Sequence, residues 1–583
     1  MAPERPPRPA VPATRSARRL AEARARLAEA DIAPTQPAAQ LRAVSNGHGP
    51  APVPRRPEPV AAVAPEVMTE RARIEALGAQ HRIPVVDLRH QTPHRDALAL
   101  LPEHIARELV AVPVRQVPGG LEIAVADVPS STTQARLAEA VRMRVGFVLA
   151  PETDIRRVID ASYRAIDRID SHIQAFEAAV SARNPADVGA ADRAAEPDAP
   201  VVEVVNAIVT QALRDRASDI HIEPQGDRVR VRYRVDGTLS DVLSLPSSMG
   251  PTLVNRIKIM AGMNIVERRR SQDGQFATVI DGRDLDVRVA TGATIRGETA
   301  VLRLLDKSRS LYKLGQLGIP PDSHAVLSRL VRSPFGMVVC AGPTGSGKTT
   351  TLYAALAEIN TVERNIMTIE DPVEYIVPGL NQQQINQSAD VTFAYGLKAI
   401  LRQDPDVILV GEMRDAETAR IAVQSALTGH LVLSSLHATD AVSALLRFLD
   451  MGIENFLVAS SLLAVVGQRL VRQICEACKA PYQPSSQELT FYREADSKPK
   501  NKFWHGEGCN FCAHTGYQDR MGVYEVLVLD EGIRKLVVQG ADAEKLRAHA
   551  LRNGMRTLLD EGLRLVDEDV TTISEILRTI YVA

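Results

Sequence analysis

The residues GPTGSGKT, at 342–349, have the types and the spacing needed to bind nucleotide phosphates. They fit the pattern G-x-x-x-x-G-K-[ST], in which glycines let backbone N–H groups curl around phosphate oxygens. The lysine neutralises β- and γ-phosphate charge, and the threonine hydroxyl is a ligand for Mg²⁺. The sequence therefore predicts a site for ATP and for Mg²⁺, with the metal on Thr349. The residues expected to bind ATP are Gly342, Pro343, Thr344, Gly345, Ser346, Gly347, Lys348, Thr349 and Thr350.

The sequence on either side of this loop has the pattern that a phosphate loop requires. An apolar stretch at 336–341 precedes the loop, and the helical sequence TTLYAALAEI follows it. A helix that begins at the loop adds the positive end of its dipole to the site. The alternative, a chance glycine-rich turn, does not explain this context.

Acidic residues end two further apolar stretches. DVILVGEMRD leads into Glu412, and TIEDPVEY carries Glu370, Asp371 and Glu374. The carboxyl ends of parallel strands face the ligand crevice of a sheet, so we expect Glu412 to act on the attacking water. Gly411 stands where an aspartate is usual, so metal contact is expected from Thr349 and from acids elsewhere. Glu370, Asp371 and Glu374 are predicted to coordinate metal-bound water. The alternative is that they are ordinary solvated carboxylates at the end of a strand.

Two histidines bracket another apolar stretch, in TGHLVLSSLHATDA. His430 stands at its start and His437 at its end. They are candidates for sensing the γ-phosphate or for ordinary structural roles, and the spacing alone does not decide between these interpretations.

Four of the five cysteines form two CxxC pairs. Cys475 and Cys478 make the first pair, and Cys509 and Cys512 make the second, 30 residues further on. Thiolates two residues apart can bind one tetrahedral ion, and two such pairs complete a four-thiolate zinc site with no position for water. The sequence therefore predicts a structural zinc ion, with a redox dithiol or an iron–sulfur cluster as alternatives. Cys340, on the strand before the phosphate loop, is predicted to be a core residue.

An arginine-rich segment, RVRVRYRVDG at 228–237, alternates in the manner of a strand. One face is apolar, the other carries Arg228, Arg230, Arg232 and Arg234, and Asp236-Gly237 supplies a hairpin turn. A second hairpin, FATVIDGRDLDVRVA, turns at Asp281-Gly282 and offers Asp284 and Asp286 as partners for some of the arginines. An arginine without such a partner is available to meet charge on the γ-phosphate.

The rest of the chain must position these groups. The stretches GMVVCAG, NIMTIED, DVILVGE and HLVLSSL alternate with helical patterns between 311 and 470, which predicts a parallel sheet covered on both faces. Upstream, RIPVVDL, LEIAVAD and VGFVLA predict strands, with helices around 102–110 and 130–142. The segment 530–583 reads as helical.

Composition describes a soluble protein of 583 residues, 45% hydrophobic and 24% charged, with a net charge of −2. The longest apolar run, at 457–466, is too short to span a bilayer, and no secretory signal is apparent, so we expect a cytoplasmic location. Residues 1–65 hold 13 of the 36 prolines and are predicted to be disordered. A charged helix at 15–30 is predicted within them, as a docking element or as a solvated transient helix.

Together these motifs resemble the ATPases of type II secretion and type IV pilus extension. The resemblance rests on RASDIHIEP (216–224), RYRVDG (232–237), QDG (272–274), LDVRVAT (285–291), GETAVLRLLDK (297–307) and the motifs above. It covers about 200–583 and, more loosely, 70–170. It implies an α/β multidomain protein in which a RecA-like P-loop core follows a PAS-like α/β domain. The implied parts are a disordered tail (1–65), a small N-terminal α/β module (66–172), a linker (173–198), the PAS-like domain (199–310), the core (311–470), a tetracysteine zinc insert (471–520) and a helical end (521–583).

The resemblance also implies an assembly and partners. It implies a homo-hexamer that works on an inner-membrane platform protein, with an adaptor on the N-terminal module, at the cytoplasmic face of the inner membrane. An arginine from a neighbouring subunit would complete each ATP site, with Arg232 the best motif match and Arg234 the next. The long N-terminal module and the cysteine insert favour assembly or secretion over pilus retraction. The pattern that binds a cyclic dinucleotide in this family is absent, so that ligand is not expected.

The family's boxes fall on Glu370, Asp371 and Glu374, on Glu412, and on His430 and His437. Tyr395 and Lys398 stand where the family commonly has arginines, and Arg402 is retained, which leaves the role of these arginines open between Lys398 and Arg402.

Two other functions compete with the motor for assembly or secretion. One is a nucleic-acid-stimulated ring motor, supported by 15 Arg/Lys against 9 Asp/Glu between 228 and 309. Against it, only 4% of residues are aromatic, and base-stacking aromatics are expected on single-strand-binding surfaces. The other is a regulatory nucleotide-binding scaffold without turnover, which the full set of acids disfavours.

Overall fold

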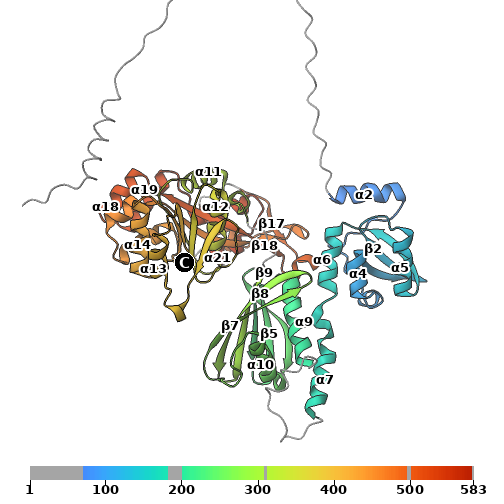
Figure 1. Ribbon diagram of the computed structural model, residues 1–583. Coiled ribbons are helices and arrows are strands. Elements are labelled where there is room, and N and C mark those ends of the chain that lie inside the picture. The colour runs from blue at the N-terminus through green and yellow to red at the C-terminus, as the bar shows by residue number, and fades with distance from the viewer. Residues whose placement is uncertain (1–69, 182–199, 307–311, 496–499, 581–583) are drawn as a thin grey trace, which may run out of the picture. The chain divides into compact units, whose positions relative to one another are not determined.

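The computed structural model of the protein describes residues 70–181, 200–306, 312–495 and 500–580 (Figure 1). The predicted disordered tail, its charged helix and residues 182–198 of the predicted linker lie outside these ranges. Residues 173–181, also predicted as linker, belong instead to helix α7 (Ile169–Ser181). Ile173 and Phe176 of this helix pack in a core with helix α9 (Pro200–Arg214), so the segment has an apolar face that a linker lacks.

A seven-stranded sheet carries the phosphate loop, in the order β12-β11-β13-β14-β10-β15-β18. The first six strands run parallel, and β18 pairs with β15 in the antiparallel direction. The predicted parallel sheet is thereby confirmed. The strands are β10 (Gly336–Ala341), β11 (Ile366–Glu370), β12 (Leu380–Gln384), β13 (Val407–Val410), β14 (Leu431–Leu436), β15 (Leu462–Ile474) and β18 (Tyr517–Val528).

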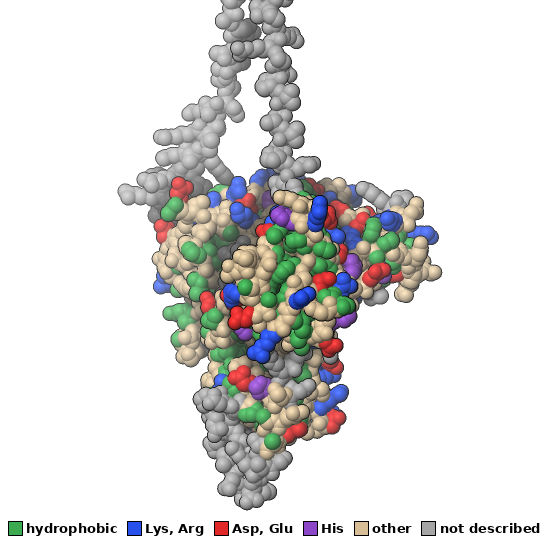
Figure 2. All heavy atoms as spheres, turned by 90° about the vertical axis from the view of Figure 1, so that its right-hand side faces the viewer, with side chains coloured by type: hydrophobic (Ala, Val, Ile, Leu, Met, Phe, Trp, Pro, Cys, Tyr) green, Lys and Arg blue, Asp and Glu red, His purple; other side chains and the backbone are tan. Residues whose placement is uncertain are grey.

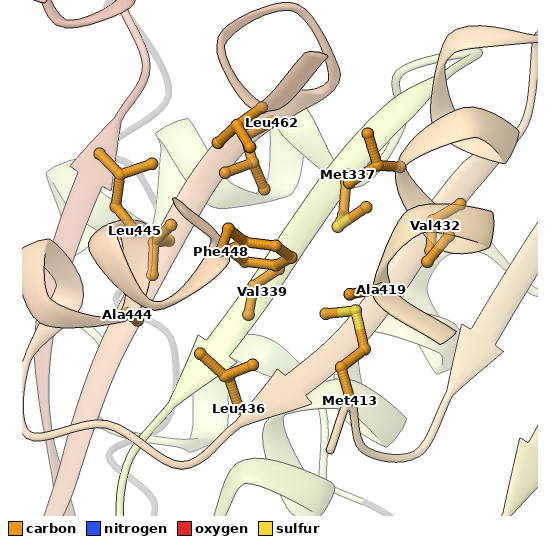
Figure 3. Close-up of a cluster of buried hydrophobic side chains, with 14 of the residues drawn as sticks. Met337, Val339, Met413, Ala419, Val432, Leu436, Ala444, Leu445, Phe448 and Leu462 are labelled. Carbon is orange, nitrogen blue, oxygen red and sulfur yellow. The ribbon is translucent and has the colours of Figure 1, made fainter. Parts of the chain in front are cut away.

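Apolar side chains cover both faces of this sheet. Met337 and Val339 of β10 point into one core, which also holds Phe448 (Figure 3), and Val338 and Cys340 point into the other. The prediction that Cys340 is a core residue is confirmed. Helices α13 (Phe393–Ile400), α14 (Ala416–Leu427), α15 (Ala441–Asp450) and α16 (Asn455–Ser461) contribute to the first core, and α11 (Pro321–Leu330) and α12 (Lys348–Ile359) to the second.

Strands β15 and β18 were not predicted. The sequence around 457–466 reads only as an apolar run, yet β15 extends over 13 residues to Ile474. Its second half mixes polar and apolar side chains without strict alternation, and several of them are only partly buried, so no single pattern marks the whole strand.

A six-stranded antiparallel sheet precedes the loop-bearing sheet, in the order β6-β5-β4-β9-β8-β7. Its strands are β4 (Asp219–Pro224), β5 (Arg228–Val235), β6 (Thr238–Pro246), β7 (Gln272–Ile280), β8 (Arg283–Thr294) and β9 (Gly297–Asp306). Helices α9 and α10 (Gly250–Met260) share a core with its apolar face. Both predicted hairpins are confirmed: Asp236-Gly237 and Asp281-Gly282 turn with positive φ at each residue, as a type I′ turn requires.

The arginine strand is β5, and its predicted alternation is confirmed. Val229, Val231 and Tyr233 are buried. The partners of the arginines come from β4, not from Asp284 and Asp286 as predicted. Arg230 and Arg232 bond to Glu223, and Arg234 lies 3.7 Å from Asp219. The prediction was wrong because β4 and β9 separate β5 from β8 in the sheet.

A three-stranded sheet lies near the start of the described chain, formed by β1 (Ala111–Val117), β2 (Gly120–Val125) and β3 (Arg144–Leu149). Two predicted strands match β2 and β3, and the two predicted helices match α4 (Glu103–Leu109) and α5 (Ser131–Val141). RIPVVDL forms only an isolated bridge, from Val85 to Leu149. Strand β1 was missed because it is an edge strand with Pro113 beside a bulge, where the strand pattern is weak. The other helices here are α2 (Glu70–His81), α3 (Arg95–Leu98) and α6 (Glu152–Ser162).

The cysteine pairs flank a small hairpin of β16 (Lys479–Tyr482) and β17 (Phe503–Gly506), with helix α17 (Ser486–Glu494) and the short 3₁₀ turn η5 (Asn510–Cys512). From residue 531 on, the predicted helical end (521–583) consists of α18 (Glu531–Val538), α19 (Ala543–Arg552), α20 (Leu558–Asp567) and α21 (Ile573–Thr579), but its first residues, 521–528, belong to β18, where they pair with β15. None of the helices within the described ranges has the length and apolar character to cross a membrane.

Candidate functional site

The predicted phosphate loop connects the end of β10 to the start of α12. Gly345 and Gly347 have φ values of 77° and 85°, a region that residues with a side chain rarely adopt. A Cβ atom on Gly342 would lie 2.6 Å from the backbone oxygen of Gln468, so a side chain has no room there. Glycine is therefore required at all three positions for the backbone to curl into a loop.

Lys348 lies at the mouth of this loop. Its Nζ donates to the carbonyl oxygens of Gly342 and Pro343, at 2.9 and 3.0 Å. Burial lowers the pKa of Lys348, while the nearby charge of Glu412 acts in the opposite direction. The ammonium group is thus held beside the loop and close to the predicted catalytic acid, where a phosphate group would meet it.

Glu412 and His437 come together because they follow adjacent parallel strands. Glu412 comes after β13, and His437 comes directly after β14. The Nε2 atom of His437 lies 2.9 Å from Oε1 of Glu412, and Nε of Arg414 donates to Oε2 at 3.0 Å. One carboxylate therefore has both oxygens fixed at the same edge of the sheet as the phosphate loop.

The three acids of TIEDPVEY have different surroundings. Glu370 is buried, and its two oxygens accept hydrogen bonds from the hydroxyls of Tyr353 and Thr368, each at 2.7 Å. With both oxygens occupied inside the protein, Glu370 joins the phosphate-loop helix α12 to the end of β11. Asp371 is exposed and lies 3.6 Å from Arg414.

Glu374, the third of these acids, is partly buried. Burial raises its pKa, and the nearby guanidiniums of Arg288 and Arg303 partly oppose that shift. Nη2 of Arg288 also donates to the carbonyl of Val373 at 3.4 Å. The contact places Arg288 beside this acid at the nucleotide edge of the core, and Arg303 stands next to Arg288 in its sheet.

Sequence reasoning missed Arg288 and Arg303. Arg288, on β8, stands opposite Arg303 of β9, and Nε of Arg303 donates to Asp219 at 3.1 Å. An open cavity of about 490 Å³ lies against both arginines and also against Asp273, Pro372 and Gln384. The signal was present in LDVRVAT, which alternates as the arginine strand does. Arg288 lies between the buried Val287 and Val289.

Arg232 and Arg234 lie on the polar face of the sheet that also carries Arg288, but their hydrogen bonds are to neighbouring residues of that sheet and its turn. Arg232 donates to Glu223, and Arg234 donates to the carbonyl of Gly237 at 3.0 Å. Within one chain, Arg414 lies beside Asp371 and Arg288 contacts the backbone next to Glu374, and the part of Arg232 stays a prediction.

The structure does not bring His430 and Arg402 to the phosphate loop. The N–H of Gly336 donates to the carbonyl of His430 at 3.1 Å, so His430 lies beside the first residue of β10, whereas the loop follows the last. The ring of His430 lies 3.0 Å from the carbonyl of Ser425. Arg402 is exposed before the amino end of β13. Within one chain, only His437 of the two histidines lies at the edge of the phosphate loop, because the strand between them separates its two ends by about 20 Å, and a phosphate-sensing role for His430 stays a prediction.

Lys398 bonds to Glu417 at 2.6 Å on the surface, and the adjacent candidate Tyr395 is exposed. In the described part of the chain, neither side chain has a contact with a residue of the phosphate loop.

The four paired cysteines form one buried cluster, in which all four sulfurs lie within 4.8 Å of one another. Three of the Sγ–Sγ distances are 3.8, 3.9 and 3.8 Å. A tetrahedral zinc ion with Zn–S bonds of about 2.3 Å requires sulfurs about 3.8 Å apart. Backbone N–H groups of Gly508, Cys509 and Gly516 also donate to the sulfurs of Cys478 and Cys512, which favours thiolates. The cluster therefore fits a structural metal ion.

Comparison with known proteins gives two family matches. Residues 194–578 match the sequence profile described as Type II/IV secretion system protein, and residues 81–169 match that of the MshEN domain. The chain is 50% identical over 380 residues to "Type II secretion system protein HxcR" of Pseudomonas aeruginosa, which is 65% of this chain and 77% of that protein.

Two further relatives extend the comparison. "Type II secretion system ATPase E" of Vibrio cholerae is 45% identical over 385 residues, 66% of this chain and 76% of the relative. "Type IV pilus assembly ATPase PilB" of Myxococcus xanthus is 38% identical over 508 residues, 86% of this chain and 89% of the relative. The similarity to the pilus protein thus extends beyond the match to the first family profile.

Proposed function

This chain belongs to the type II/IV secretion system protein family and is an ATP-hydrolysing enzyme, and on that basis we propose that it is a hexameric motor for assembling type IV pili or a type II secretion pseudopilus. It would act through an inner-membrane platform protein from the cytoplasmic side, with an adaptor on its N-terminal module. The observation that supports this most is the convergence of the phosphate loop, Glu412 and His437 at the carboxyl ends of neighbouring parallel strands. A purified chain should sediment as a hexamer and release phosphate from ATP.

The residues at this edge divide the chemistry among them. The loop N–H groups and Lys348 hold the phosphates, and Thr349 would hold Mg²⁺, which when bound offsets phosphate charge. Glu412 orients the attacking water, and His437 fixes Glu412 by their 2.9 Å contact. Glu374 lies beside Arg288 and suits metal-bound water. Glu370 instead joins helix α12 to β11 through its hydrogen bonds with Tyr353 and Thr368.

We propose that Arg288, assisted by Arg303, meets the charge that develops on the γ-phosphate. Arg288→Ala should lower kcat by at least about tenfold, since a charge-assisted contact to a phosphate is lost in the transition state. ADP affinity should change little, because ADP has no γ-phosphate. Steady-state phosphate release and ADP titration measure the two effects.

Arg232→Ala is the matched comparison. Arg232 is held by Glu223 in a single chain, so we expect a smaller loss of kcat than in Arg288→Ala. A larger loss, together with recovery of activity when Arg232→Ala and Glu412→Gln chains are mixed, would instead assign the role to Arg232 acting across a subunit boundary.

A nucleic-acid-stimulated ring motor is not favoured. The relatives above are named for secretion and pilus assembly, and Arg230 and Arg232 are paired by Glu223 within the sheet. On the face shown in Figure 2, basic and acidic side chains are interspersed. Single-stranded DNA should therefore leave the rate of ATP hydrolysis unchanged, and a salt-sensitive stimulation would contradict this.

A further inference from the structure

Strand β15 brings a buried glutamine against the phosphate loop. The parallel register of β10 with β15 pairs Ala341 with Gly467, so the next residue of β15, Gln468, stands beside Gly342. Gln468 is 1% exposed, and Ser346 within the loop is 3% exposed. The contact between the side chain of Gln468 and the backbone of Ser346 joins residues that are 122 positions apart in the sequence.

The glutamine touches the loop with both its backbone and its side chain. Its Nε2 donates to the carbonyl oxygen of Ser346 at 2.7 Å. A Cβ atom on Gly347 would lie 2.9 Å from that same Nε2, and one on Gly342 would lie 2.6 Å from the backbone oxygen of Gln468. Gln468 therefore packs against two of the three glycines of the loop, Gly342 and Gly347, and forms a wall behind them.

The hydrogen bond fixes the direction of one peptide group. In a trans peptide the C=O and the following N–H point to opposite sides. Because the Ser346 carbonyl is held toward Gln468, the N–H of Gly347 is turned away from the wall, toward the concave side of the loop. We propose that Gln468 is a positioning residue that aims the Gly347 N–H at a phosphate oxygen of the bound nucleotide. This inference rests on the ATP site of the proposed function.

A second observation supports a role beyond stability. The Oε1 atom of Gln468 is buried and has no hydrogen-bond partner among the described residues. A buried acceptor without a partner costs stability. A methionine of the same size would remove this unpaired acceptor, but it would leave the Ser346 carbonyl without its donor. The amide supplies only the Nε2 donor, and that donor contacts the phosphate loop.

Gln468→Met tests the proposal, because it keeps the volume and removes the donor. Affinity for ADP and for ATP should fall by about tenfold, the effect of one lost hydrogen bond. Both nucleotides should be affected alike, since the loop N–H groups cradle phosphates that both contain. The melting temperature without nucleotide should change little, because the substitution removes one unpaired buried acceptor, Oε1 of Gln468, and creates another at the Ser346 carbonyl. Titration with a fluorescent ADP analogue, competition with ATP and thermal unfolding measure these values on the full chain.

Gln211→Met is the matched control. Gln211 is also a fully buried glutamine, and it bonds to the N–H of Ala165 and to Asp215 in a different sheet-and-helix core. Its replacement should lower the melting temperature and leave nucleotide affinity unchanged. Gln468→Glu is the second test variant, because glutamate keeps the shape but replaces the donor with an acceptor, and the same loss of affinity is expected.

The outcomes separate this inference from the proposed function. If the unmodified chain binds neither ADP nor ATP, the proposed ATP site is wrong, and the inference with it. If the unmodified chain binds but both Gln468 variants bind within twofold of it, only the role of Gln468 is wrong. A loss of affinity that appears only together with a lowered melting temperature, as unfolding would produce, also overturns the role.

Discussion

Replacing Glu412 by glutamine should abolish ATP turnover while ATP still binds. The amide keeps the size of the side chain and an oxygen that can accept from Arg414, but it loses the negative charge that we propose orients and polarises water. Loss of such a group typically costs about 10²- to 10⁴-fold in rate. The measurements are phosphate release at saturating ATP and the Kd for ATP.

Glu363→Gln is the control for this variant, because Glu363 is exposed in the turn after helix α12. It should hydrolyse ATP at the unmodified rate. In cells, the Glu412→Gln chain should fail to support surface pili or secretion. Near-normal hydrolysis by Glu412→Gln would mean that another group, with Glu374 the next candidate, acts on the water.

Breaking the cysteine cluster should have the largest effect on structure. We propose that the cluster binds one zinc ion per chain, and structural zinc contributes apparent free energies of roughly 10–16 kcal/mol in small zinc domains. Cys509→Ser should therefore lose the metal, and the segment 471–520 should become open to proteolysis. Metal analysis of the purified chain and limited proteolysis check this expectation.

Cys340→Ala is the comparison for Cys509→Ser, since Cys340 lies in the sheet core and outside the cluster. It should retain one zinc ion per chain. Iron in place of zinc, with visible absorbance, would favour an iron–sulfur cluster. Absence of any metal from the unmodified chain would contradict the zinc site.

The cysteine cluster is also connected to the phosphate loop through β15. Gln468 contacts the loop, and the same strand ends at Ile474, directly before Cys475. Arg472, between them, bonds to the buried Glu575 of α21 at 2.8 Å. One strand thus contacts the phosphate loop and the C-terminal helices and leads into the metal cluster. Its side chains serve three different surroundings, which explains why a local sequence pattern did not reveal the strand.

The sequence by itself determined the groups whose chemistry is local. The phosphate loop could be predicted because its glycines, Lys348 and Thr349 lie within eight consecutive residues that lead into one helix. The cysteines could be predicted because a CxxC spacing already fits one tetrahedral ion. The buried parallel strands could be predicted because strands covered on both faces are apolar throughout.

Only the tertiary structure decided which distant groups meet. It placed His437 beside Glu412 but left His430 at the other end of the strand, although both histidines border the same apolar stretch. It buried Glu370 under the hydroxyls of Tyr353 and Thr368. It brought Arg288 to the carbonyl of Val373, next to Glu374, while Arg232 bonds to Glu223. Strand order and register fix these contacts, and neither is encoded in the residues next to each group, so residue types alone could suggest the candidates but not their partners.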